Sequence, residues 1–205
     1  MLSASILFSA SALANVEATD PYAMVKDVAS KTFDRIKREQ QDIKQDPEKL
    51  RKVMEEELLP YIDYKFAAFM VLGKHFRSVP EDKLGEYVQV FREYLITSYA
   101  IAMGYYDDQE VLFEPSGEWD DKKTVTVRAL IKDDDRPDIK VAFMVRKNKK
   151  SDEWRAYDMV AEGISLISSK RSEFESILRQ DGIEKVIAIM RDTIEKPIVL
   201  QAKES

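Results

Sequence analysis

Cysteine is absent from the 205 residues, and the chain has a single histidine, His75. Without thiols there is no disulfide, so the hydrophobic core must hold the fold alone. A Ser-His-Asp catalytic triad would need His75 beside an activated serine, and the surrounding GKHFR stretch contains no serine. Zinc sites need three or four nitrogen or sulfur ligands at short spacings, which this composition does not supply. We therefore expect no metal and no resident cofactor.

Glycine is also scarce. The six glycines form neither GxGxxG nor GxxxxGK[ST], so the sequence does not support a glycine-rich loop that binds the phosphates of a nucleotide. The net charge of −6 argues against nucleic acid, whose binding depends on clustered Lys and Arg, and against tight adsorption to anionic lipid. With 44% hydrophobic and 34% charged residues, the composition is typical of a globular domain.

The first fourteen residues, MLSASILFSASALA, carry no charge. They read as the apolar region of a signal peptide that ends in the small-residue pattern Ala12-Leu13-Ala14, with cleavage before Asn15. The stretch is too short for a membrane span. A remnant of cloning or of a misassigned start is the alternative. We expect residues 1–14 to be a signal peptide remnant, residues 15–205 to form a single domain, and the protein to be periplasmic.

Helix signals dominate the first half of the chain. Asp20-Pro21 and Asp46-Pro47 each place a capping aspartate before proline, and Ser78-Val79-Pro80-Glu81 fits a capping box. The helix behind the box runs to Gly104. Its apolar surface is broad, which indicates burial from two sides.

Alternating hydrophobic residues take over after Gly104 and predict four antiparallel strands. These are Tyr105–Glu114, Lys123–Lys132, Ile139–Lys147 and Trp154–Ala161. Two further helices follow, around Phe174–Leu178 and Ile183–Ile194. The pattern predicts an α+β fold, with about six or seven helices packed on one face of a curved four-stranded antiparallel sheet.

Asp158 and Glu162 are the carboxylates that could serve as an acid/base pair, because they share a strand face with Val160. Gly163 follows them directly and indicates a bulge or a bend in the backbone. Carboxylates beside a bend commonly accept backbone N–H bonds or pair with arginine. We therefore favour a structural role over catalysis and expect that the protein is not an enzyme.

Inward-facing apolar residues are abundant in both halves of the chain. Periodicity alone favours a packed core. Methionine and aromatic side chains also line adaptable lipid cavities, and composition does not separate a filled interior from a hollow one.

Several stretches together resemble one family. In chain order they are PYAMV, KTFDRIK, ELLPYIDYKFA, VLGKHF, FREYL, RKN and W-x-AYDMVAEGISLI-x-x-K, the last at residues 154–170. From about Pro21 to Ile198 the chain resembles MlaC, the periplasmic phospholipid-binding family of the system that maintains outer-membrane lipid asymmetry.

The resemblance implies a twisted four-stranded sheet with helices around a deep apolar pocket, which takes the acyl chains and leaves the head group outside. It also implies two partners: an inner-membrane ATP-driven lipid transporter and an outer-membrane lipoprotein–porin complex. The phospholipid is cargo rather than cofactor, and we expect a monomer. The alternatives are a non-carrying periplasmic adaptor and a binder of another hydrophobic small molecule.

The candidate lipid-binding residues come from the apolar faces. They are Phe66, Phe69, Met70, Phe91, Leu95, Tyr99, Val127, Ile139, Val141, Phe143, Val145, Met159 and Ile164.

Overall fold

The first helix begins where its sequence signal predicts. Asp20 precedes α1 (Pro21–Arg38), and its Oδ1 accepts hydrogen bonds from the backbone N–H groups of Tyr22 at 2.8 Å and Ala23 at 3.0 Å. Such a cap satisfies donors that have no partner within the helix. The computed structural model describes residues 17–106, 109–132 and 137–200. The expected leader at residues 1–14 lies outside these ranges.

Short helices follow and lead to the longest one. These are α2 (Gln40–Gln45) and α3 (Lys49–Val53), a π-helical turn over Met54–Leu58, a 3-10 turn over Leu59–Tyr61, α4 (Tyr64–Leu72), a second 3-10 turn over Gly73–Ser78, and α5 (Glu81–Met103). The predicted capping box is wrong. Pro80, not Ser78, precedes α5, and its extended backbone separates the serine from the helix, so the Ser78 hydroxyl donates to the His75 carbonyl instead.

The four predicted strands are present, and a short fifth strand follows them. The first strand is shorter than the predicted Tyr105–Glu114, because Tyr105 and Tyr106 continue the turn at the end of α5 and donate to the Ala102 and Met103 carbonyls. The sheet is antiparallel in the order β1 (Glu110–Phe113), β2 (Thr124–Lys132), β3 (Ile139–Lys147), β4 (Trp154–Ala161) and β5 (Ile164–Ser165). Glu162 and Gly163 join the last two strands with φ of 49° and 80°. Two positive φ values in a two-residue loop are typical of a type I′ hairpin, so the bend expected at Gly163 is a strand reversal.

Two helices close the chain, α6 (Leu166–Gln180) and α7 (Gly182–Ile194). The predicted segment around Phe174 covers only the middle of α6. The helix begins eight residues before Phe174 because Ser165 caps it, accepting the Ser168 N–H at 3.0 Å.

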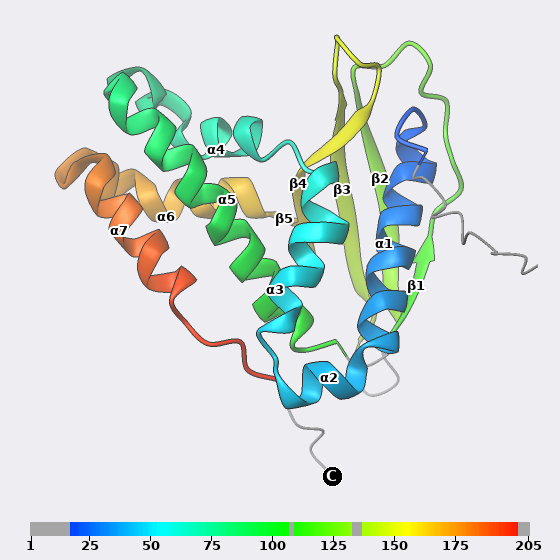
Figure 1. Cartoon of the computed structure of the whole chain (residues 1–205). Coiled ribbons are helices and arrows are strands. Elements are labelled where there is room, and N and C mark those ends of the chain that lie inside the picture. The colour runs from blue at the N-terminus through cyan, green and yellow to red at the C-terminus, as the bar shows by residue number, and fades with distance from the viewer. Residues whose placement is uncertain (1–16, 107–108, 133–136, 201–205) are drawn as a thin grey trace, which may run out of the picture.

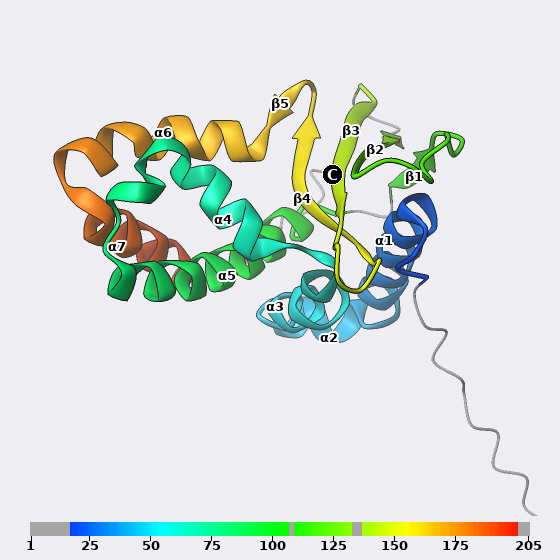
Figure 2. The ribbon, with the colours of Figure 1, turned by 90° about the horizontal axis from the view of Figure 1, so that it is seen from above.

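Three separate clusters of buried side chains hold these elements together. One joins α4, α5, α6 and α7; the second joins the ends of α1 and α5 to α2 and α3; the third packs α1 on the sheet around Trp154. Figure 1 accordingly shows the helices α4–α7 on one side, the sheet with α1 on the other, and α2 and α3 at the base. The view from above separates the same two parts (Figure 2).

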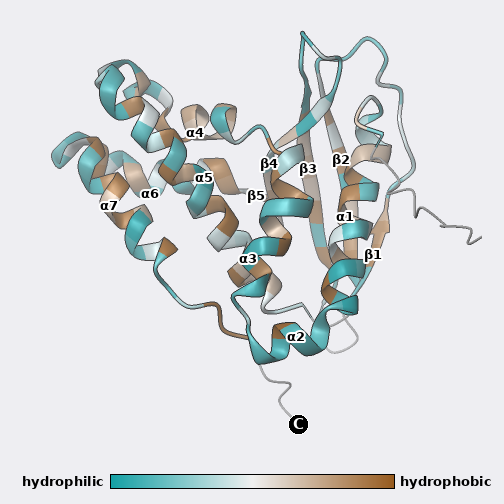
Figure 3. Cartoon of the chain, viewed as in Figure 1, coloured by the Kyte–Doolittle hydropathy of each residue, from teal (hydrophilic) through white to brown (hydrophobic). Residues whose placement is uncertain are grey.

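The long helices mix hydrophobic and hydrophilic residues along their length (Figure 3), whereas α4 is apolar from Phe66 to Leu72. Among the residues that the structure describes, no helix combines the length and the apolar character that crossing a membrane requires.

Residues 196–200, which we call the C-terminal strap, return from α7 to the base of the molecule. Arg51 Nη2 donates to the Lys196 carbonyl at 2.7 Å, and the Ile198 N–H donates to Glu48 Oε1 at 2.8 Å. This bond is the leading reason that the pKa of Glu48 is lowered. The strap crosses the end of α5 so closely that a Cβ on Gly104 would lie 2.6 Å from the Val199 carbonyl oxygen.

We expect Gly104→Ala to destabilise the protein by about 1–3 kcal/mol, because the strap must move away from the added methyl group. Gly85→Ala is the matched control on the same helix, since its Cβ would meet nothing within 4 Å. The higher helix propensity of alanine should make this control neutral or up to about 1 kcal/mol more stable. Urea unfolding measures both, and equal behaviour of the two variants would contradict the close contact.

Candidate functional site

The inner face of the sheet, on which α1 packs, is apolar along every long strand. Strand register places Val127 opposite Phe143, and Phe143 opposite Met159. Because side chains alternate along a strand, one face gathers the whole hydrophobic set. It consists of Val125, Val127, Ala129, Ile131, Ile139, Val141, Phe143, Val145, Met159 and Ala161.

Helix α1 covers only part of this face. Val127 and Val145 are buried beneath Met24 and its neighbours on α1. Burial then falls towards β4 and β5. Phe143 and Met159 are half-buried, whereas Ile139 is 39% exposed and Ile164 is 64% exposed. The inner face therefore continues beyond the helix that seals it.

The candidate residues on the helices lie in different settings. Phe91 is buried in the cluster of α4–α7, while Phe69, Met70 and Leu95 are half-buried against that cluster. Phe66 instead contacts the sheet. Its ring centroid lies 5.2 Å from that of Tyr157 and 4.0 Å from the guanidinium carbon of Arg146.

Tyr99 marks the interior between α5 and the sheet. Its removal from water raises its pKa to about 12, with a smaller contribution from Asp158. The side chain nevertheless remains only half-buried. Tyr99 therefore lies at the boundary of the buried cluster that joins α5 to α2 and α3, where it is only partly covered.

The packing of neighbouring elements agrees with this. The three buried clusters share no residue, and half-buried side chains link them: Tyr64 contacts the first two and Leu58 the last two. Helix α5 packs chiefly on α7, α4 and α3 rather than on the strands. Neither of these linking residues is among the candidates predicted from the sequence. The sequence indicates them only by an apolar or aromatic side chain close to Pro60, the residue at which the helical pattern is interrupted.

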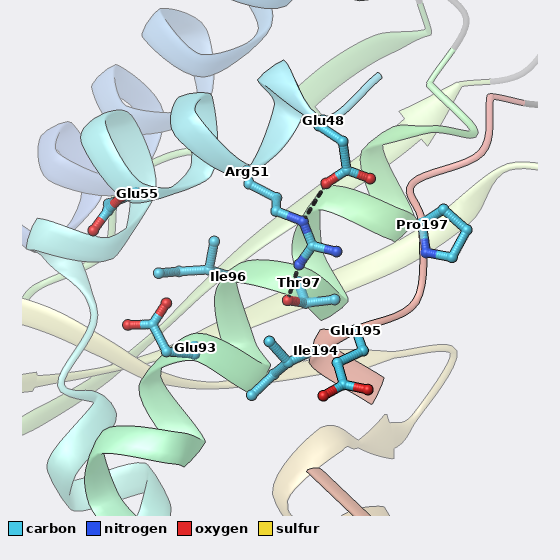
Figure 4. Close-up of a pocket in the computed structure, with 9 residues that line it drawn as sticks. All are labelled: Glu48, Arg51, Glu55, Glu93, Ile96, Thr97, Ile194, Glu195 and Pro197. Carbon is cyan, nitrogen blue, oxygen red and sulfur yellow. Dashed lines mark hydrogen bonds and ion pairs between the residues drawn. The ribbon is translucent and has the colours of Figure 1, made fainter. Parts of the chain in front are cut away.

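Two surface clefts formed by described residues do not gather the candidate set. The first, of about 490 Å³, lies between α3, α5 and the end of α7 and is acidic. Figure 4 shows Arg51 bonded there to Glu48 and Thr97. Its lining residues are Glu48, Arg51, Glu55, Glu93, Ile96, Thr97, Ile194, Glu195 and Pro197. Its four carboxylates make this cleft unsuitable as a binding site for acyl chains.

The second cleft, which we call the outer groove, lies on the opposite side of the sheet from α1 and measures about 600 Å³. Among the candidates, only Val141 contributes to the lining of either described cleft. The outer groove is lined by Leu112, Phe113, Glu114, Pro115, Arg128, Ala129, Leu130, Lys140, Val141, Ala142, Val160 and Gly163. This groove was not predicted from the sequence. Its signal was that Leu130 and Ala142 stand where strict alternation expects polar residues.

Asp158 and Glu162 have the structural role that the sequence favoured. Asp158 Oδ1 accepts the N–H groups of Met159 at 2.9 Å and Ile167 at 3.0 Å, and its Oδ2 accepts the Ser165 hydroxyl at 2.6 Å. Glu162 accepts the N–H of Lys140. Asp158 thus fastens β4 to β5 and to the first turn of α6, where a carboxylate also complements the helix dipole.

In the described ranges, no three His, Cys, Asp or Glu residues lie close enough together to hold a metal ion. The Nε2 atom of His75 is buried without a hydrogen-bond partner in the same ranges.

We expect Asp158→Asn to lower the free energy of unfolding by about 1–3 kcal/mol, because the amide leaves part of this network unsatisfied. Glu162→Gln should cost less, since Glu162 is exposed and its side chain accepts only the Lys140 N–H in the described structure. Urea unfolding of the two variants compares them. If Asp158→Asn unfolds at the wild-type midpoint, the network does not stabilise the junction.

Comparisons with known proteins agree with this architecture. A protein from Haemophilus influenzae, named intermembrane phospholipid transport system binding protein MlaC, is 32% identical over 182 residues, which cover 88% of this chain and 85% of that protein. A solved structure of a phospholipid-binding protein from Ralstonia solanacearum, in complex with a phospholipid, has the same fold. Its TM-score is 0.75 at 19% identity, over 85% of this chain and 97% of that one. Residues 26–192 match the MlaC protein family, and the chain therefore belongs to that family.

Proposed function

We propose that this protein is a periplasmic phospholipid carrier that moves diacyl lipids between outer-membrane and inner-membrane complexes. The relationship to the Haemophilus protein named for intermembrane phospholipid transport carries this proposal, because it extends over most of both chains. The Ralstonia protein of the same fold was solved with a phospholipid, which supports a fold with room for such a ligand.

The acyl chains, in this proposal, lie between α5 and the part of the inner sheet face that α1 leaves uncovered. Phe143 and Met159 would contact them from the sheet, and Leu95 and Tyr99 from α5, since all four are half-buried. Ile139 and Ile164 are exposed at the margin of the same face and would contact the chains near the opening. The buried candidates Phe91, Val127 and Val145 would support these residues from behind.

The thermodynamics of transfer explain why a carrier is needed. A diacyl lipid has roughly thirty methylenes, and burying each contributes about 0.8 kcal/mol, so more than about 20 kcal/mol opposes passage of a bare lipid through water. A bilayer offers the same burial as an apolar pocket. Transfer from membrane to protein therefore has a free energy near zero, which allows the carrier to load at one site and unload at another.

Direction must then come from the partners, since the sequence contains no phosphate-binding loop for coupling to ATP. We propose an inner-membrane ATP-driven transporter and an outer-membrane lipoprotein–porin complex as these partners. Residues 1–14 would direct export, and residues 15–205 would form the single lipid-binding domain. The net charge of −6 favours rapid release from anionic membrane surfaces. The protein acts by binding and requires no catalytic step.

Protein purified without detergent should contain about one phospholipid per chain, because the acyl chains have no favourable route into water. Organic extraction followed by mass spectrometry, referred to protein concentration, measures this ratio. Absence of any extractable lipid from such a preparation would count decisively against a carrier and favour an adaptor. If the extract contained a different hydrophobic molecule, the pocket would still be a binding site, but its ligand would not be a phospholipid.

Phe143→Glu should abolish lipid retention, because it places a charge on the inner face against the acyl chains. Thr126→Glu is the matched control. It adds the same charge next to Val127 on β2, where the side chain points to the outer face and is also half-buried. Lipid content and circular dichroism are measured for both.

Met159→Trp provides a test that adds no charge, since it fills space beside Phe143. It should lower the lipid content while the protein stays folded. Equal lipid content in all three variants would show that the acyl chains lie elsewhere.

A further inference from the structure

The outer groove is an apolar surface that no element of the described structure covers. Leu112, Leu130, Ala142 and Val160 occupy its floor, on the side of the sheet opposite to α1. Leu112 is 42% exposed. An antiparallel sheet commonly leaves one face in water, but that face is then polar. Four apolar residues gathered in a hollow of about 600 Å³ match the size of sites that receive a ligand.

Two cations stand at this groove without ion-pair partners in the described structure. Arg128 lies opposite Ala142, and Lys140 lies opposite Leu130, so the two basic residues are diagonal neighbours on the same face. Both side chains are exposed. Nearby Lys132 differs, because Asp138 binds it at 2.7 Å. Like charges in diagonal positions repel each other, and an anionic group placed between them would relieve this repulsion.

The lining of the outer groove is more basic than the molecule as a whole, although the Glu162 carboxylate accepts the Lys140 N–H beside it. The lining residues include Arg128 and Lys140 but a single carboxylate, Glu114, whereas the chain carries a net charge of −6. We propose that the outer groove docks an acidic, amphipathic segment of a partner protein. Apolar side chains of that segment would fill the floor of the groove, and its carboxylates would pair with Arg128 and Lys140.

Two other occupants fit the groove less well. An anionic bilayer is planar, whereas the apolar floor is recessed, and the net charge of the chain opposes adsorption. A second copy of this chain would bring its own Arg128 and Lys140 against the same pair in a two-fold arrangement. A partner with carboxylates meets neither obstacle.

The test uses the full chain and a short fluorescein-labelled peptide that alternates leucine with glutamate. Fluorescence anisotropy at low salt should show binding to the wild type. Binding should weaken about tenfold or more in the double variant R128E/K140E, which loses both charge pairs. The double variant K149E/K150E changes the net charge equally on the exposed β3–β4 turn and should bind as the wild type does. Glu114→Gln should bind more tightly, because it removes the carboxylate at the groove.

Four outcomes would overturn the proposal. In the first two, the wild type fails to bind the glutamate peptide at millimolar concentration, or R128E/K140E binds it equally well. In the third, a peptide with lysine in place of glutamate binds more strongly than the glutamate peptide. In the fourth, the wild type is a dimer, and the R128E/K140E substitutions dissociate it. Vesicles of phosphatidylglycerol are tested in parallel, and binding that depends on Arg128 and Lys140 would identify a membrane surface instead. Lipid content is measured in the same preparations. Retained lipid with lost peptide binding separates this proposal from the carrier function.

Discussion

A sheet with one wholly apolar face has to hide that face from water, and this requirement organises the whole molecule. The face extends over β2, β3 and β4, but α1, at 18 residues, is about 27 Å long and one helix wide. It therefore seals the β2 side and leaves Phe143 and Met159 half-buried. The helices α4–α7 do not complete the cover, because they bury most of their apolar surface against one another. The apolar area that remains between the two parts is what a lipid carrier needs.

Asp158 has a second organising role. One carboxylate joins the end of β4 to Ser165 and to the Ile167 N–H at the start of α6, so the sheet and the helices α4–α7 are fixed to each other at this junction. Arg171, one turn further along α6, donates to the Met70 carbonyl at 2.8 Å and ties the same helix to α4. These bonds explain the structural role of Asp158, although its spacing from Glu162 resembles that of a catalytic carboxylate pair.

Sequence patterns predicted what depends on local periodicity and capping. The strands β2, β3 and β4 were located almost to the residue, because their alternation is unbroken, and Asp20-Pro21 located the start of α1. The failures have local causes as well. Val79-Pro80 is extended and defeats the capping box, and β5 is too short to show a period of two. The candidate site is harder to predict, because periodicity assigns a residue to an apolar face without showing which element covers it. Phe91 and Leu95 share one helix face in sequence, yet one is buried and the other only half-buried.

The C-terminal strap has a consequence for the order in which the protein folds. Ile198 lies in the same buried cluster as Ile36 and Leu50, and its N–H bonds to Glu48, 150 residues earlier in the chain. Contacts of such separation form late, because a long loop must close first. The base of the molecule therefore closes only once the C-terminal strap has docked beside Glu48. A core that depends on so distant a contact is completed in one late, cooperative step rather than element by element along the chain.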